Sequence, residues 1–275
     1  MKQITALVLL CIVFMACNNK SDKDSSAGFT IADTLLSKVE SNQELPAISD
    51  STKMKILKRG GGYLSYSDYK NEFRDENNFS IRWQDIDADG RNEIITNYYT
   101  GGAHCCEGNT ILSQTGKDTM QEILTYTGGI AVSNDTVLLN FEEALGYFHT
   151  CYACGKDYPK EIIPSVRFQF KAGKFSMLPT DAQINNDIEV NLRSLLAKPI
   201  PDKESEEESG FDDGTRKAIA FNLVAFYFNN QRNLTKTREL FQQYYTHRDK
   251  NIIWKDLTKY ISGFDDDIRK GVLLN

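Results

Sequence analysis

Four acidic side chains fall within nine residues of one segment, residues 83–106, which reads WQDIDADGRNEIITNYYTGGAHCC. Three of them occupy alternate positions, a glycine follows at once, and the fourth comes three residues later: Asp85, Asp87, Asp89, Gly90 and Glu93. Carboxylates in this pattern, before a glycine that permits a sharp reversal, can fold around one hard cation. Calcium is the expected ion, because its ligands are oxygen atoms and it tolerates irregular geometry.

The residues after the aspartates indicate what kind of loop this is. With Asp85 as the first position of an EF-hand loop, Thr96 would stand at the twelfth, where an EF-hand has glutamate. Residues 94–99, IITNYY, are typical of a strand, whereas an EF-hand loop continues into a helix. An Asx-turn bend that binds no metal is the alternative, since aspartate and glycine favour turns in any case.

The segment resembles the strand-flanked D-x-D-x-D-G-x-x-[DE] loop of FG-GAP and VCBS-type repeats. That resemblance implies calcium held by four carboxylates and one backbone carbonyl, those of Asp85, Asp87, Asp89, Glu93 and, through its carbonyl, Arg91. The sequence holds no second copy of the loop, although propellers and solenoids are built from repeats. Residues 80–180 also resemble a group of bacterial exported proteins in which an Asp-rich loop precedes G-G-A-H-C-C. This second resemblance implies a secreted β module and no particular activity.

Two groups of cysteine and histidine follow the acidic loop: His104, Cys105 and Cys106, then His149, Cys151 and Cys154. An even number of cysteines in an exported chain favours disulfides. Cross-links between the groups are expected, either 105–151 with 106–154 or 105–154 with 106–151. The pairing 105–106 with 151–154 is expected least, because adjacent cysteines close a strained ring.

Two other interpretations of these residues stay open. A C-x-x-C pair at 151–154 could be redox-active, but such pairs usually open a helix, and residues 155–159, GKDYP, predict a loop. Zinc is the other possibility, since the ligand types suit it. The run at 104–106, however, lacks the two-residue gap of common zinc knuckles.

The first residues indicate the compartment. Lys2 precedes an apolar run over residues 4–16, which is too short to span a bilayer comfortably and fits a secretory signal. The run ends in Phe-Met-Ala-Cys, which resembles a bacterial lipobox and implies lipidation of Cys17. Residues 18–28 are small and polar, as in a flexible tether. We therefore expect a lipid-anchored protein of the bacterial cell envelope, on the periplasmic face of the outer membrane or on the cell surface.

Composition and motifs restrict the function further. The chain carries 32 Lys+Arg against 38 Asp+Glu, a net charge of −6, which argues against nucleic acid as a partner. It contains three histidines and no G-x-S-x-G, H-E-x-x-H or P-loop motif. A hydrophobic content of 40% is ample for a packed core.

Hydrophobic periodicity predicts an α+β fold. A short helix is expected at 32–40, and antiparallel strands at 54–58, 62–66, 80–84, 93–99, 110–114, 121–126, 137–141, 147–152, 165–170 and 174–178. Helices are expected around 188–196 and 218–228, after an Asn233 cap, and over 253–261 with Gly263 as the end. The expected domains are a signal peptide (1–16), a tether (17–28), a β-rich domain (29–180) and a helical domain (181–275) with an acidic loop at 202–213.

Together these features predict a lipid-anchored, non-catalytic binding or accessory module with a structural calcium site. Its expected partners are the membrane, through the anchor, and an envelope protein or glycan. The alternative is an envelope enzyme, either a thiol oxidoreductase using Cys151 and Cys154 or a metal-assisted hydrolase using the acidic loop.

Overall fold

A computed structural model describes residues 54–72, 77–99, 107–157, 159–160, 164–197, 199–200 and 213–272. Several predicted features lie outside these residues: the signal, the tether, the helix at 32–40, Cys17, the group His104–Cys106 and most of the acidic loop.

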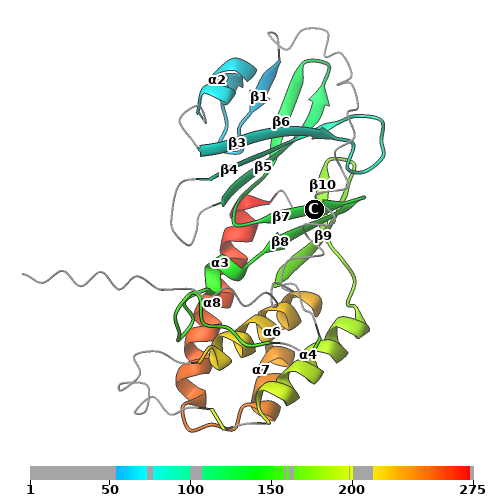
Figure 1. Ribbon diagram of the computed structural model, residues 1–275. Coiled ribbons are helices and arrows are strands. Elements are labelled where there is room, and N and C mark those ends of the chain that lie inside the picture. Colours follow the sequence, from blue (N-terminus) through cyan, green and yellow to red (C-terminus); the bar gives the residue numbers. More distant parts are fainter. Residues whose placement is uncertain are drawn as a thin grey trace, which may run out of the picture. The chain divides into compact units, whose positions relative to one another are not determined.

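Two sheets form the β-rich part of the chain (Figure 1). The first has six strands, in the order β2 (Tyr63–Ser65), β1 (Lys55–Leu57), β6 (Thr119–Thr127), β5 (Glu107–Gly116), β4 (Glu93–Tyr99) and β3 (Asn77–Gln84). The second has four, in the order β10 (Lys174–Met177), β9 (Ser165–Lys171), β8 (Thr136–Asn140) and β7 (Ile130–Ser133). All neighbours are antiparallel except β1 and β6, which are parallel.

Helices occupy the C-terminal part. They are α4 (Ala182–Leu195), α6 (Thr215–Asn229), α7 (Leu234–Tyr244) and α8 (Lys250–Gly271), with two short helices earlier, α2 (Tyr66–Glu72) and α3 (Glu142–Leu145). The chain therefore has the predicted α+β fold. None of the described helices combines the length and the apolar character that crossing a bilayer requires.

Local sequence explains the hairpin of β9 and β10. Alternate residues of β9 are buried, namely Val166, Phe168 and Phe170, as expected for a strand with one face on the core. Ala172 and Gly173 form the turn with φ of 51° and 75°, and left-handed values are most easily adopted by glycine. The predicted hairpin is confirmed.

The C-terminal helices bury different fractions of their surface. α6 is buried over every residue from Thr215 to Phe228, as its continuous apolar sequence predicts. α7 begins after Asn233, whose side chain accepts a hydrogen bond from Lys236 N at 2.9 Å, and this predicted cap is confirmed. α8 runs through Gly263 to Gly271, so the predicted end of this helix is wrong. The helix continues because Phe264 and Ile268 still face the core beyond that glycine.

One buried cluster joins the sheets to the helices. It contains Ile95 and Ile111 from the first sheet, Phe168 from the second, and many helical residues such as Leu223 and Leu257. This cluster draws side chains from both sides of residue 180. The division into two domains at that residue stays a prediction.

A smaller cluster lies on the opposite face of the first sheet. It contains Ile94 and Leu112, the chain neighbours of Ile95 and Ile111, together with Ile56 from β1. Successive strand residues point to opposite faces, so β4 and β5 are covered on both sides. Tyr69 of α2 is fully buried in this cluster, and α2 therefore covers that face.

The predicted strand at 147–152 is wrong. These residues form turns after α3, although Phe148 is buried in the main cluster. His149 has φ of 53°, which a strand does not accommodate. The carbonyls of Cys151 and Tyr152 accept hydrogen bonds from Lys217 of α6 instead of from a neighbouring strand. Three short elements, α2, α3 and β7, were not predicted.

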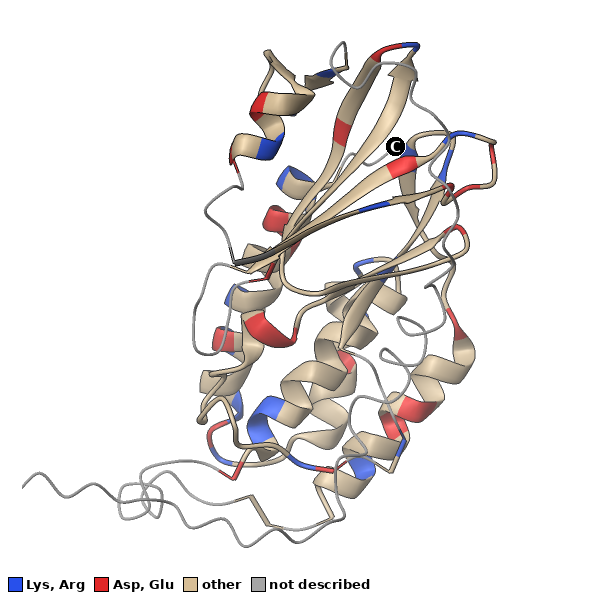
Figure 2. Cartoon of the chain, turned by 45° about the horizontal axis from the view of Figure 1, so that its top comes forward, with Lys and Arg blue, Asp and Glu red and all other residues tan. Residues whose placement is uncertain are grey.

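Charged residues are distributed widely over the described elements. Figure 2 shows the positions of basic and acidic residues interspersed along the helices and strands rather than separated by sign. The expectation that nucleic acid is not a partner stays a prediction.

The strands β4 and β5 contribute side chains to both hydrophobic clusters, so we expect the chain to unfold in one cooperative transition. The two tryptophans report on different parts, because Trp83 packs on the smaller cluster and Trp254 on the main one. The variants Trp83→Phe and Trp254→Phe each keep one tryptophan. In each variant, the urea midpoint from the fluorescence of that tryptophan should therefore equal the midpoint from far-UV circular dichroism of the same variant. Clearly separated midpoints would instead favour two independent domains.

Candidate metal centre

The three aspartates lie in the connection between β3 and β4. Gln84 and Glu93 are paired across these antiparallel strands, so residues 85–92 form the whole connection. Two of these residues adopt left-handed backbone conformations, Ala88 with φ of 55° and Gly90 with φ of 86°. The reversal predicted at the glycine is therefore present.

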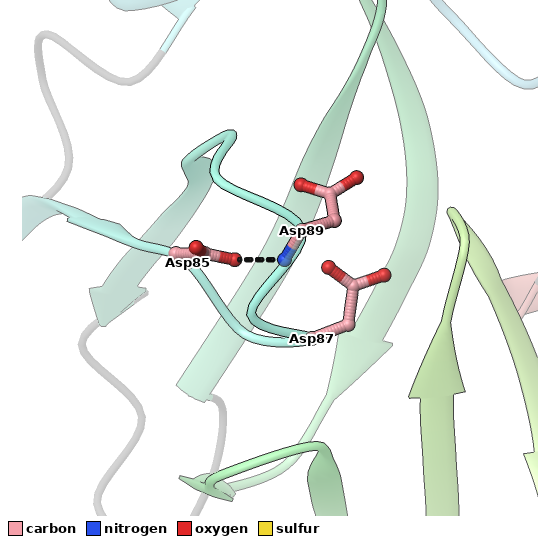
Figure 3. Close-up of side chains that lie close together, drawn as sticks. All are labelled: Asp85, Asp87 and Asp89. Atoms are coloured by element: carbon pink, nitrogen blue, oxygen red, sulfur yellow. Dashed lines mark hydrogen bonds between the residues drawn. The ribbon is translucent and has the colours of Figure 1, made fainter.

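The loop brings the carboxylates of Asp85, Asp87 and Asp89 together. One oxygen of each lies within 4.8 Å of the others (Figure 3). Asp85 and Asp87 are partly buried, and Asp89 is exposed. In the described part of the chain this is the only group of three or more histidine, cysteine or acidic residues arranged to hold a metal ion. All its donors are oxygen, which suits calcium or magnesium rather than zinc.

Two of the three carboxylates hold the loop itself. Asp85 accepts hydrogen bonds from Asp89 N at 3.0 Å and from Gly90 N at 2.9 Å. Asp89 accepts from the backbone N–H of Arg91 and from its guanidinium. The hydrogen bond from the Arg91 side chain lowers the pKa of Asp89, so this carboxyl stays ionised.

Asp87 connects the loop to the other sheet. Its Oδ2 accepts a hydrogen bond of 2.6 Å from Ala172 N, in the turn between β9 and β10. Its Oδ1 is buried and has no hydrogen-bond partner among the residues that the structure describes. A buried acceptor without a partner carries a desolvation penalty of about 1–3 kcal/mol, and more when charged. A cation beside the other two carboxylates would remove that penalty, so the donors present fit calcium.

Glu93 lies apart from this three-carboxylate group. It is buried, and its oxygens accept from Ile86 N at 3.0 Å and from Ser113 Oγ at 3.1 Å. Burial, aided by the negative charges of Asp87 and Asp89, raises the pKa of Glu93 to about 7 against the opposing effect of these hydrogen bonds. Glu93 and the carbonyl of Arg91 stay predicted ligands, because neither has been placed on an ion.

Ser113 and Ala172 were not found by sequence reasoning. Ser113 supports Glu93, and Ala172 N holds Asp87. Neither carries a local pattern, because Ser113 reaches Glu93 through the pairing of β4 with β5, and Ala172 reaches Asp87 through the packing of the two sheets. In the described residues, the turn between β9 and β10 ties the acidic loop to the second sheet.

The cysteines pair differently from the prediction. Cys151 and Cys154 form a disulfide with each other, so the cross-links predicted from these two to Cys105 and Cys106 are wrong. Cys154 N donates to the Cys151 carbonyl at 3.2 Å, and this turn brings their Cα atoms to 5.2 Å, within the usual disulfide range. The Nε2 atom of His149, in the same loop, forms a hydrogen bond of 2.9 Å with Oδ2 of Asp256.

Gly90 allows a direct test of the loop's geometry. An added Cβ would meet no atom within 4 Å, so Gly90→Ala introduces only left-handed backbone strain. We expect a loss of about 1–2 kcal/mol in the free energy of unfolding. Gly60→Ala is the control, because its Cβ also meets no atom and its φ lies outside the left-handed region. Equal urea midpoints for the two variants would contradict the described loop.

Comparisons with protein-family models, with curated proteins and with solved structures found no match for this chain. The resemblances to FG-GAP and VCBS-type loops and to exported proteins with G-G-A-H-C-C therefore rest on the residues quoted for them. Any function proposed for the chain rests on its own geometry.

Proposed function

We propose that this chain is a lipid-anchored protein of the bacterial cell envelope that acts as a binding or accessory module and whose metal centre is non-catalytic. A calcium ion at Asp85, Asp87 and Asp89 fixes its β-rich part. The observation that carries the calcium proposal is Asp87: one oxygen holds the turn of the second sheet, and the other is buried beside two more carboxylates with no hydrogen-bond partner in the described part of the chain.

A structural role suits this site better than a catalytic one. The carboxylates of Asp85 and Asp89 already hold backbone N–H groups of their own loop, and Asp87 holds that of Ala172. An ion there would tie the β3–β4 connection to the β9–β10 hairpin. The partner that this fixed surface meets is proposed to be an envelope protein or a glycan.

The anchor is supported by the sequence alone, by the short apolar run that ends at Cys17. We expect Cys17→Ser to abolish incorporation of labelled palmitate in a bacterial host and to move the chain from the membrane to the soluble fraction. Cys11→Ser, within the same apolar run, is the control and should leave labelling intact. Labelling that survives Cys17→Ser would contradict the anchor.

Calcium should stabilise the folded chain. Sites of this kind outside the cell bind at about 10⁻⁴–10⁻³ M, so 10 mM calcium, a concentration of about 10–100 times Kd, should add about 1.4–2.7 kcal/mol. The measurement is the melting temperature in calcium against EDTA. Magnesium should act more weakly, because it demands near-ideal octahedral geometry.

Asp87→Asn isolates the charge from the hydrogen bond. The amide oxygen can still accept from Ala172 N, while the negative charge is lost, so the calcium-dependent shift should shrink or disappear. Asp118→Asn, in the exposed turn between β5 and β6, is the matched control and should keep the full shift. If the melting temperature of the parent chain were the same in calcium and in EDTA, the metal centre would be refuted.

A further inference from the structure

The Cys151–Cys154 disulfide lies in a loop that a buried lysine holds. Lys217 of α6 is 5% exposed, and its Nζ donates to the carbonyls of Tyr152 at 2.8 Å, Cys151 at 3.3 Å and Gly146 at 3.5 Å. The ammonium therefore lies against the backbone of the cysteine loop. A cation in this position favours the thiolate form of a nearby cysteine when the disulfide opens.

The same loop packs on the N-terminus of α6. Gly214 is the N-cap of this helix, and a Cβ added to it would lie 2.9 Å from Gly155 N and 3.0 Å from the carbonyl carbon of Cys154. The first turn of a helix carries partial positive charge, which also favours a thiolate. The sequence predicts no helix directly after the C-x-x-C pair, but the fold supplies one from 60 residues later.

The disulfide lies in a partly exposed segment, and aromatic side chains lie beside it. Cys151 and Cys154 are partly buried, and Ala153 between them is exposed. Tyr147 is 58% exposed, and its ring centroid lies 5.5 Å from that of Tyr152, within the C-x-x-C pair itself. Exposed aromatic rings offer apolar contact to the side chains of a polypeptide, which a small thiol would not use.

Other charged groups surround the loop. Burial raises the pKa of Tyr152 most, and the negative charges of Glu142 and Glu143 raise it further. The same charges oppose the formation of a thiolate in this loop. Lys156 is paired with Asp213 at 2.7 Å, and His149 with Asp256 at 2.9 Å. Lys217 differs from these residues in being buried, where a charge acts more strongly than at the surface.

We infer that Cys151 and Cys154 form a thiol–disulfide exchange site for polypeptides that carry two cysteines. A substrate thiolate attacks the sulfur of Cys154, the Cys151–Cys154 bond breaks, and Cys151 leaves as a thiolate near Lys217. The second substrate thiolate then attacks the substrate sulfur of this mixed disulfide and releases Cys154. The substrate loses two electrons and two protons, and the protein gains them as two thiols. A disulfide-bearing partner protein returns the site to its oxidised form by the reverse steps. The site shares no residue with the metal centre.

Peptide mapping can follow this site in the full chain. Trypsin releases residues 118–156 as one peptide, which contains Cys151 and Cys154 and no other cysteine. In native protein equilibrated with glutathione buffers, this peptide should interconvert between disulfide and dithiol. In the reverse step, Cys151→Ser given a synthetic dicysteine peptide in its disulfide form should accumulate a mixed disulfide: the Cys154 thiolate attacks the peptide disulfide, one peptide sulfur leaves as a thiolate, and the missing Cys151 cannot resolve the product. A disulfide that opens in excess dithiothreitol only after denaturation would overturn the inference.

Two further variants separate an exchange site from a structural cross-link. Tyr147→Ala, at an exposed position, should slow exchange with the dicysteine peptide several-fold and leave exchange with glutathione unchanged. If Tyr147→Ala changed the two exchange rates by the same factor relative to the parent chain, the polypeptide substrate would be overturned.

The second variant tests the lysine. In folded, reduced protein, the alkylation of Cys151 and Cys154 is followed against pH and measured in peptide 118–156. Lys217→Met should raise the pH midpoint of this alkylation by about one unit, a tenfold loss of thiolate, whereas Lys217→Arg should not. Lys236→Met, on the exposed face of α7, is the control. An unchanged alkylation profile in folded Lys217→Met would remove the role given to that ammonium.

Discussion

The helix α6 is buried around its whole circumference, and a helix in that position needs apolar partners on every side. The rest of the fold meets this requirement. α4, α7 and α8 pack on α6 from the helical part, while β9 and α3 contact it from the β-rich part. Aromatic rings fill the junction, where Phe141 lies edge-on to both Phe221 and Phe264. Sheets and helices therefore share one core, because neither part could cover this helix alone.

Burial of α6 also imposes a condition on its charged residues. Arg216 and Lys217 stand in its first turn, and an unpaired charge in a core is strongly unfavourable. Arg216 forms an ion pair of 2.9 Å with Asp249, which also accepts from Tyr245. Lys217 is satisfied by the carbonyls of the cysteine loop. A requirement for hydrogen bonding thus fixes the conformation of a surface segment that has little regular structure of its own.

Sequence periodicity was sufficient where one element decides its own conformation. The strand of Glu93–Tyr99, the hairpin of β9 and β10 and the Asn233 cap all follow from local pattern. Long-range contacts were not accessible in this way. The residues at 147–152 have strand-like composition, but Lys217 takes their carbonyls, and the pairing of Cys151 with Cys154 follows from that turn. The helix α2 did carry a signal that was overlooked, since Ser65 Oγ accepts from Asp68 N in the S-x-x-D arrangement. In the metal centre the aspartates were found from their spacing, whereas the contact with Ala172 depends on how the two sheets pack.

The last described residue has a consequence for the order in which the chain matures. Val272 forms an isolated bridge with Leu124 of β6, and α8 contacts that strand. During synthesis the N-terminal portion of a chain is available for folding first. The strand β6 is therefore complete long before the ribosome adds the residue that bridges Leu124. Until then Leu124, which is fully buried in the finished protein, lacks its final neighbour. The β-rich part of a nascent chain would expose apolar surface until α8 and Val272 have been made, and its need for chaperone protection would be greatest in that interval.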